Sequence, residues 1–348
     1  MGSQAARPDA AGAPIASLGA GAGRVLAALA AAAPAALSGE ELCLPLEISR
    51  AQVWKHVELL RRRGYAIEGM PGGGYRLQGR PDRLLPEALL PRLGTRWLAR
   101  ALVCYERTDS TNTRALALAR AGAAQGTCVI AEAQSAGRGR LGRSFFSPAY
   151  QNLYTSILLR PAASLARAPA FILASATAVA ESVAEELGAA SRVELKWPND
   201  VLIDGQKTSG ILLELGAEAT RVAWLVIGIG VNLNVARDAL PEEFRARATS
   251  LCTALGRRVD RLDFAARLYG KLESVFDACA REGLPGIRER FERYFRMPGQ
   301  RVRAIESEGT EIAGIAQGID ADGALLIQED GGTLRRVLAA DVSLAKEP

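Results

Sequence analysis

The sequence predicts an α+β protein with three structural parts, because three patterns follow one another along its 348 residues. Short amphipathic helices and a hairpin are expected in residues 21–80. Strands alternate with longer helices over residues 81–296, and short strands separated by glycine turns fill residues 297–348. A chain of this length exceeds what one hydrophobic core usually supports. The alanine- and glycine-rich residues 1–20 are expected to be a disordered tail.

Composition limits the chemistry that the chain can perform. Hydrophobic residues make up 49% of it and charged residues 23%, as in ordinary soluble globular proteins. The longest apolar stretches, residues 170–180 and 223–233, are too short to span a bilayer, so no membrane association is expected. The five cysteines are scattered, which favours reduced thiols in the cytoplasm over disulfides or a metal site. With the single histidine His56, catalysis is expected to rest on Arg, Lys, Asp, Asn and a ligand-borne metal.

The first part predicts a winged helix-turn-helix. One helix is expected over Arg24–Ala32, and Ser38 begins a second because it can form a capping box with Glu41. A third helix is expected from its cap at Ser49 through Arg63, where Gly64 ends it. Two short strands joined by a Pro-Gly-Gly-Gly turn then predict a hairpin, the wing.

The third helix is strongly basic, and in a winged helix-turn-helix such a helix lies in the major groove of DNA. The candidate DNA contacts are its polar and basic residues: Ser49, Arg50, Gln52, Lys55, His56, Arg61 and Arg62. The alternative is a small helical domain that serves dimerisation or docking.

A glycine- and arginine-rich segment, Gly137–Arg143, follows a strand expected over residues 127–133. Glycine lets the backbone approach a ligand closely, and arginine offers a fork of donors suited to carboxylate and phosphate. A Walker phosphate loop is excluded because no Gly-Lys-Ser/Thr closes the run. Taken alone, the segment is compatible both with a ligand-binding loop and with a basic surface loop.

The remainder of the central part predicts a mixed sheet with covering helices. Further strands are expected over residues 102–106, 152–159, 193–197, 201–203, 210–215 and 223–235, and helices over residues 109–121, 168–187, 261–280 and 285–295. The polar run Asp109–Asn112 either caps its helix or lines a pocket. Gly228 and Gly230 interrupt the last strand, as where a ligand approaches closely, and Asn232 and Asn234 fall on one face by alternation.

The last part predicts a small five-stranded barrel without a catalytic motif. Its recognisable strands are residues 300–305, 311–319, 324–328 and 334–337. Asp322-Gly323 and Gly331-Gly332 supply the hairpin turns. The barrel is expected to pack against the central part.

The order of these motifs closely resembles that of biotin–protein ligases. It runs through Ser110–Asn112, Gln134, Gly137–Arg143, Ser147-Pro148, Lys196–Asp200, Lys207 and Gly228–Asn232. The N-terminal winged helix makes the resemblance closest to the bifunctional bacterial form, which also represses the biotin synthesis operon. The resemblance extends from about Arg24 to Leu344. It implies a central domain like that of class II aminoacyl-tRNA synthetases and a C-terminal SH3-like barrel.

The resemblance also implies roles for individual residues. Contacts to biotin are implied for Ser110, Thr111, Asn112, Gln134, Arg138, Gly139, Arg140, Lys207, Gly210 and Gly230. The ATP and Mg²⁺ side is implied to comprise Arg140, Arg143, Lys196, Trp197, Asn199, Asp200 and Asn232. Arg138, Arg140 and Lys207 would be catalytic. Mg²⁺ would arrive with ATP, with Asp200 as its candidate protein contact.

The implied reaction is ATP-dependent formation of biotinyl-AMP and transfer of biotin to a lysine of the biotin carboxyl carrier protein of acetyl-CoA carboxylase. The implied regulation is binding of operator DNA at biotin synthesis genes, with biotinyl-AMP as corepressor and ligand-dependent homodimerisation as the switch. The alternatives are a ligase with a vestigial winged helix, a non-catalytic biotin-sensing repressor, and a lipoate ligase. The phosphate-handling residues Asn199, Asp200 and Lys207 argue against a pure sensor, and the winged helix argues against lipoate ligation.

Several positions depart from the family pattern. Phe145 replaces a common tryptophan, and Leu141 stands where the repressor form often has arginine. Pro45 falls where a helix of the DNA-binding motif normally continues, and Glu47 where a turn glycine is usual, so both weaken the expectation of operator binding. Near the end of the chain, Ala345 takes the place of an arginine on the ATP side, for which Lys346 could substitute.

Overall fold

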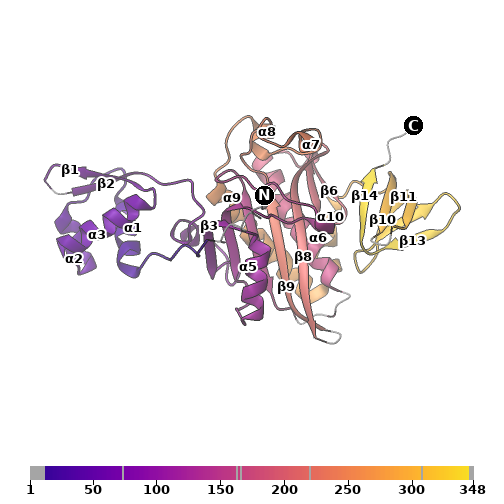
Figure 1. Ribbon diagram of the computed structural model, residues 1–348, viewed down its shortest axis with the longest axis horizontal. Coiled ribbons are helices and arrows are strands. Elements are labelled where there is room, and N and C mark those ends of the chain that lie inside the picture. Colours follow the sequence, from indigo (N-terminus) through magenta and orange to yellow (C-terminus); the bar gives the residue numbers. More distant parts are fainter. Residues whose placement is uncertain are drawn as a thin grey trace, which may run out of the picture. The chain divides into compact units, whose positions relative to one another are not determined.

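The computed structural model describes residues 12–72, 74–161, 164, 167–218, 221–306 and 309–344. These residues form two compact units, one over Ile15–Pro91 and one from Arg92 onward together with the residues before Ile15. Figure 1 labels the elements of both units. Residues 1–11 of the expected tail, and Ala345 and Lys346, lie outside the described residues. In the described ranges, no helix has both the length and the apolar character needed to cross a membrane.

The first unit contains the three helices and the hairpin of a winged helix-turn-helix. Its elements are α1 (Ala20–Ala32), α2 (Gly39–Leu46), α3 (Arg50–Arg62), β1 (Ala66–Met70) and β2 (Gly74–Gly79), and the two strands pair antiparallel. The predicted capping box of Ser38 with Glu41 is formed, and Ser49 forms a second box with Gln52. Helix α1 begins at Ala20, before the expected Arg24. Ala22 of this added turn is buried in the core, so packing supports the turn although Gly21 and Gly23 disfavour helix.

The apolar stripe of α3 closes the core of this unit. Val53, Val57 and Leu60 are each at most 1% exposed, and they pack with Leu29 of α1 and Leu42 of α2. The short α4 (Pro86–Leu89) and η1 (Leu90–Arg92) follow the wing. Pro86 is the first residue of α4, where its missing N–H costs no hydrogen bond.

The two unusual residues of the DNA-binding motif are accommodated at the end of α2. Pro45 lies inside the last turn of the helix. Glu47 follows as its C-cap in the left-handed conformation, with a φ of 53°. A residue with a Cβ pays about 1–2 kcal/mol for that conformation, which explains why glycine is usual there. The helix-turn-helix therefore forms despite both departures.

The second unit is built on a seven-stranded mixed sheet in the order β3-β4-β5-β9-β8-β7-β6. The strands are β3 (Leu102–Thr108), β4 (Cys128–Gln134), β5 (Leu153–Leu159), β6 (Val193–Lys196), β7 (Asp200–Ile203), β8 (Gln206–Glu218) and β9 (Arg221–Val231). The β3–β4 pair is parallel, and helix α5 (Thr111–Arg120) is its crossover. The other pairs of neighbouring strands in this order are antiparallel.

Helices cover both faces of this sheet. On β5, the Ser156 side chain contacts α5, whereas its neighbour Thr155 contacts Tyr269 of α9 (Arg261–Glu282). Because alternate strand residues point to opposite faces, α5 and α9 lie on opposite sides. Helix α6 (Ala168–Leu187) packs against α9, and Figure 1 shows the helices around the central sheet.

Several boundaries differ from those expected. Strand β9 ends at Val231 rather than Val235, so Asn232 and Asn234 lie beyond the strand. The helix expected over residues 285–295 is divided into η5 (Leu284–Ile287) and α10 (Arg288–Glu292), where Pro285 and Gly286 interrupt regular helix. The short α7 (Glu242–Arg245), α8 (Leu251–Leu255), η2 (Arg140–Gly142) and η4 (Ala190–Arg192) were not expected.

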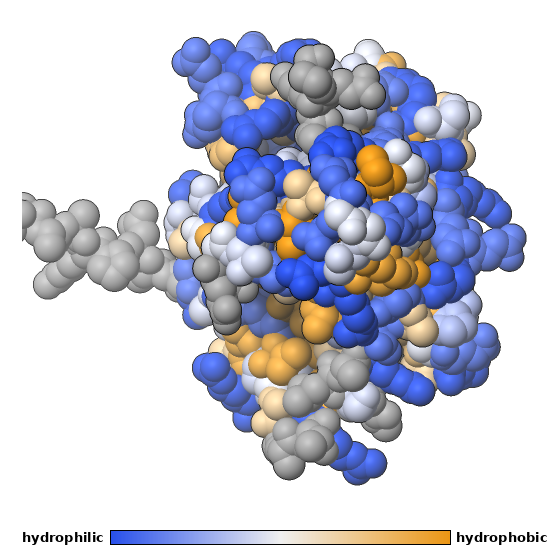
Figure 2. Space-filling view, turned by 90° about the vertical axis from the view of Figure 1, so that its right-hand side faces the viewer, coloured by the Kyte–Doolittle hydropathy of each residue, from blue (hydrophilic) through white to orange (hydrophobic). Residues whose placement is uncertain are grey.

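The C-terminal part is a five-stranded antiparallel sheet in the order β13-β12-β11-β10-β14. Its strands are β10 (Arg301–Glu306), β11 (Glu311–Ile319), β12 (Leu325–Glu329), β13 (Leu334–Val337) and β14 (Ala340–Leu344). The last of these was the strand that the sequence pattern did not locate. Trp197 joins this sheet to the central part, because its indole Nε1 donates to the Gly323 carbonyl at 2.9 Å. On the face seen in Figure 2, hydrophobic surface lies in small areas among hydrophilic residues.

Candidate active site

The Gly137–Arg143 segment is a tight loop between β4 and β5. Gly139 N donates to Arg143 O at 2.7 Å, and Phe145 N donates to Gly137 O at 2.8 Å. A Cβ on Gly137 would lie only 2.5 Å from Phe145 O, so this position requires glycine. Leu141 takes a left-handed conformation at the tip. The backbone thus folds back on itself, and the arginine side chains extend outward to different elements.

Each arginine of the loop has a different partner. Arg138 Nη2 lies 2.8 Å from Glu214 Oε2 on β8. Arg140 donates to Asn199 Oδ1 at 3.2 Å and to Ala340 O at 3.3 Å. Arg143 forms an ion pair with Asp341 on β14. The loop therefore bridges the central sheet and the C-terminal sheet.

These contacts set the electrostatics of the loop. Burial lowers the pKa of Arg140, and the nearby carboxylates of Asp200 and Asp341 oppose that effect. The hydrogen bond from Arg143 lowers the pKa of Asp341, with further contributions from Lys196 and Arg140. Asp341 is therefore a carboxylate surrounded by cations. The same cations would attract an anionic ligand.

Lys207 lies at the start of β8, where the register of the β7–β8 pair shifts. Its backbone is held from both sides, because Lys207 N donates to Arg247 O at 2.8 Å and Lys207 O accepts from Thr249 N at 2.9 Å. Its Nζ lies 2.6 Å from Asp200 Oδ1. That oxygen is buried and has no partner in hydrogen-bond geometry, so the contact is an ion pair rather than a directed hydrogen bond. A second cation is thus fixed close to Asn199 and Arg140.

A buried polar cluster begins at the N-terminus of α5. Gln134 Oε1 accepts from Thr111 N at 2.9 Å and from Thr111 Oγ1 at 3.1 Å. Ser156 Oγ lies 2.8 Å from Thr111 Oγ1 and 2.6 Å from Asn112 Oδ1, within hydrogen-bond distance of both. Ser110 is the N-cap, yet its side chain makes no capping hydrogen bond. Of the two roles open for this run, the structure therefore favours lining a polar site over capping.

Glycines leave the strands beside this cluster without side chains on the facing surface. A Cβ on Gly228 would overlap the Asn112 amide, and one on Gly230 would lie 2.5 Å from the Phe145 ring. Gly210 is paired with Gly230 and approaches Lys207 and Phe145 in the same way. The Phe145 ring also meets Tyr154 edge-to-face at 6.3 Å. The glycine-bearing strand segments at positions 210, 228 and 230, here called the glycine floor, form one surface with the Phe145 ring and the polar cluster.

Two expected ATP-side residues lie apart from this surface. Trp197 is 2% exposed and points to Gly323. Asn232 is buried, where its Nδ2 donates to Thr249 O at 3.1 Å and its Oδ1 accepts from Asn152 at 3.3 Å. Both side chains are engaged in holding the fold together.

Sequence reasoning missed three residues of the site. Ser156, Glu214 and Asp341 all contact predicted site residues through hydrogen bonds or ion pairs. Glu214 is a single charge within the apolar run Ile211–Leu215, which was an available signal. Ser156 follows Thr155 in β5, and Asp341 lies in the strand that was not located.

The residues present are compatible with Mg²⁺ that enters with a nucleotide. In the described part of the chain, no group of three or more His, Cys, Asp or Glu is placed to hold a metal. Mg²⁺ in nucleotide sites usually keeps several waters and needs only one or two carboxylates besides the phosphates. Asp200, with its buried oxygen, could supply one of them.

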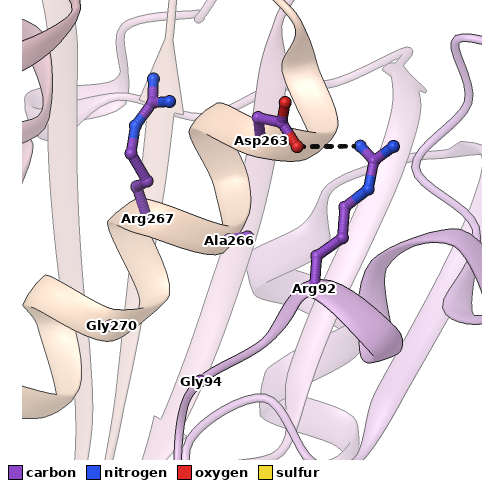
Figure 3. A pocket seen from close by; sticks show the side chains of 6 residues that line it. All are labelled: Arg92, Gly94, Asp263, Ala266, Arg267 and Gly270. Carbon is purple, nitrogen blue, oxygen red and sulfur yellow. Dashed lines mark ion pairs between the residues drawn. The ribbon is translucent and has the colours of Figure 1, made fainter.

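A separate cavity of about 370 Å³ lies along α9 (Figure 3). Its lining residues are Arg92, Gly94, Asp263, Ala266, Arg267 and Gly270. Two of these residues, Arg92 and Asp263, form an ion pair at 3.2 Å, which is drawn as a dashed line in Figure 3. None of the predicted site residues lines this cavity, so it is distinct from the candidate active site.

The predicted DNA contacts on α3 are divided by the fold. His56 packs against α1, where a Cβ on Gly21 would lie 2.6 Å from His56 Nε2. Arg61 pairs with Glu58 at 2.7 Å and donates to Ile67 O at 2.9 Å. The side chains of Ser49 and Gln52 complete the capping box. Arg50, Lys55 and Arg62 remain exposed.

The fold and site define a ligase that activates a carboxylic acid for attachment to a protein. Residues 104–232 match the biotin/lipoate A/B protein ligase family, residues 299–345 the biotin protein ligase C terminal domain, and residues 24–76 an HTH domain. The chain belongs to the biotin protein ligase family, in the arrangement that carries an N-terminal helix-turn-helix. The resemblance predicted from the order of the motifs is thereby confirmed.

Relatives named bifunctional ligase/repressor BirA match this chain over almost their whole length. That of Bacillus subtilis is 36% identical over 308 residues, which is 88% of this chain and 94% of the relative. That of Escherichia coli is 35% identical, over 88% of this chain and 92% of the relative. The solved biotin protein ligase from Aquifex aeolicus in complex with biotin and ATP aligns with a TM-score of 0.61 and 28% identity, over 71% of this chain and all of that one.

A substitution at Gly228 in the glycine floor tests whether biotin binds against this surface. Gly228→Ala is expected to raise the Kd for biotin by about tenfold or more, because the added methyl displaces the Asn112 amide from Ser156. Isothermal titration with biotin measures this effect. Gly270→Ala on α9 is the control, since open space surrounds that position. Equal affinities of the two variants would contradict a role for Gly228 in biotin binding.

Proposed function

We propose that the protein is an ATP-dependent biotin–protein ligase that also represses biotin synthesis genes. It forms biotinyl-5′-AMP and transfers biotin to a lysine of the biotin carboxyl carrier protein of acetyl-CoA carboxylase. The observation that carries the proposal is the convergence of Arg140 and Lys207 beside a polar cluster and a strand floor bare of side chains. Family membership supports the same activity.

The polar cluster suits the ring end of biotin. The ureido group is neutral and needs both donors and acceptors, which Ser110, Thr111, Asn112 and Gln134 supply. The glycines at positions 210, 228 and 230 leave room for the bicyclic ring, and neighbouring apolar strands suit the valeryl chain. The Phe145 ring, now resting over Gly230, would become a wall of this site or move aside for the ligand.

Adenylation brings two anions together, and the cations of the site offset their repulsion. The biotin carboxylate attacks the α-phosphate of ATP, the bond to the β-phosphate breaks, and pyrophosphate leaves. Arg138, Arg140, Arg143 and Lys207 lie where they would stabilise the charge that develops in the transition state. Mg²⁺, when bound with ATP, would neutralise further phosphate charge, and we assign Asn199 and Asp200 to that side.

Transfer needs no nucleophile from the enzyme. The neutral amine of the acceptor lysine attacks the carbonyl carbon of biotinyl-AMP, loses a proton, and displaces AMP. Water would compete for the same mixed anhydride. The Gly137–Arg143 loop is fastened on both sides of the site, to Glu214 and to Asp341, and in that position it would exclude water.

The finer features of the proposal concern architecture and assembly. The central sheet is assigned to the class II aminoacyl-tRNA synthetase-like type and the C-terminal sheet to the SH3-like type. Domain boundaries are placed at residues 21–80, 81–296 and 297–348, after the tail of residues 1–20. We place the protein in the cytoplasm, as a homodimer once biotinyl-AMP is bound, with that adenylate as the corepressor.

Transfer of labelled biotin to a purified carrier domain tests the ligase. Incorporation should require ATP and Mg²⁺ and should disappear when the acceptor lysine is replaced by arginine. Absence of transfer at saturating biotin and ATP would refute the enzyme and leave the non-catalytic repressor.

A shift assay with DNA from upstream of a biotin synthesis gene tests the repressor. At physiological salt, the protein is expected to shift the duplex only when biotin and ATP are both present, because the adenylate drives dimerisation on the operator. Biotin with a non-hydrolysable ATP analogue is the control. A protein that transfers biotin but never shifts the duplex would be a ligase with a vestigial winged helix.

A further inference from the structure

The recognition helix carries a large apolar side chain that the fold does not use. Trp54 lies on α3 and is 55% exposed. The core of its unit is complete without it, since α3 contributes Val53, Val57 and Leu60. An indole held in water leaves much apolar area unburied, which favours an interaction that covers it.

The neighbours of Trp54 indicate what covers it. At helical spacing, Arg50 and Trp54 share one face of α3, flanked by Ala51 and Lys55, and all four are exposed. Glu58, the acidic residue of the helix, is neutralised by Arg61 at 2.7 Å. Among the described residues, neither Arg50 nor Lys55 has an ion-pair partner. The face is therefore apolar in the middle and cationic at its edges, which suits a polyanion that offers apolar groups between its phosphates.

The fold also engages other α3 side chains that were candidates for contacts to bases. His56 is packed against α1, Arg61 is bound to Glu58 and β1, and Gln52 is held by the cap at Ser49. The exposed residues left to face a groove are Arg50, Ala51, Trp54 and Lys55, with Arg62 at the C-terminal end of the helix. In the major groove of B-form DNA, the apolar group presented by bases is the thymine methyl.

We propose that Trp54 reads thymine methyl groups in the major groove and is a specificity-determining residue of operator binding. Arg50 and Lys55 supply attraction to the phosphates on either side, and Ala51 leaves room for the base edge. The inference rests on the DNA-binding half of the proposed function and names the chemistry by which that half selects its site.

The test uses the full chain with biotin and ATP, and two duplexes from upstream of a biotin synthesis gene. One contains thymine and the other has uracil at every thymine position, which removes the methyl groups and keeps the base pairing. The wild-type protein is expected to bind the thymine duplex about tenfold more tightly. Trp54→Ala is expected to lose about tenfold or more on the thymine duplex and to bind both duplexes equally. Its salt dependence should match that of the wild type, because no phosphate contact is removed.

Controls separate this inference from its alternatives. Leu334→Ala removes a similarly exposed apolar side chain, 54% exposed on β13, and should keep the preference for thymine. Biotin transfer by Trp54→Ala should equal that of the wild type, which shows that the unit carrying the ligase site is intact, and its unchanged salt dependence shows that the winged helix still engages the phosphates. Retention of the thymine preference by Trp54→Ala would overturn the inference, as would a weakened self-association of that variant with unchanged DNA affinity. A wild-type protein that shifts neither duplex would refute the repressor itself.

Discussion

Lys207→Ala and Arg140→Ala are each expected to slow formation of biotinyl-AMP by about 100- to 1000-fold, the usual effect of removing one preorganised group that stabilises a developing charge. Both cations are fixed before any ligand arrives. The backbone of Lys207 is held by Arg247 and Thr249, and Arg140 is held by Asn199 and the Ala340 carbonyl. Little reorganisation is therefore needed when the two anions meet.

Exchange of labelled pyrophosphate into ATP measures this step without the acceptor protein. The effect should fall mainly on kcat, because the charges act most strongly in the transition state. Lys207→Gln distinguishes charge from bulk and should be nearly as slow as Lys207→Ala. Arg281→Ala is the matched control, since it removes an exposed arginine that pairs with Glu282 at the end of α9. Exchange at the wild-type rate in either site variant would show that the charge-neutralisation account is wrong.

Arg261→Ala is expected to lower the free energy of unfolding by about 3–5 kcal/mol, the usual result of removing one partner of a buried ion pair. Arg261 is 0% exposed at the start of α9, and its Nη1 lies 2.7 Å from Glu132 Oε2 on β4. It also donates to the Asn152 carbonyl at 3.2 Å. The substitution removes the cation that faces the Glu132 carboxylate, which is itself 1% exposed.

Urea unfolding followed by far-ultraviolet circular dichroism measures the loss. The double variant Glu132→Leu with Arg261→Met should regain part of the stability, because no charge then stays buried. Arg301→Ala, which removes an exposed partner of Asp330, should leave the unfolding midpoint nearly unchanged. A midpoint for Arg261→Ala that matches this control would mean that the buried pair contributes little.

Features that depend on nearby residues could be predicted well. The box of Ser38 with Glu41 closes over three residues, and the cap at Ser49 sets the start of α3 in the same way. The limits of α6, β11 and β13 also agree with the expected ranges. Where local signals conflicted, prediction was weaker: Pro285 and Gly286 divide a segment that reads as one helix.

The sequence by itself determined the family, the α+β class and the helix-turn-helix, and it proposed most residues of the candidate site, because motif order and local capping chemistry are written in short stretches. Only the tertiary structure decided how those residues are used. It connected Asn112 to Glu214, 102 positions away, and Arg140 to the Ala340 carbonyl, 200 positions away. It also turned His56 toward α1 and left Trp54 exposed. These outcomes depend on packing between distant segments, for which no single stretch of sequence carries a signal.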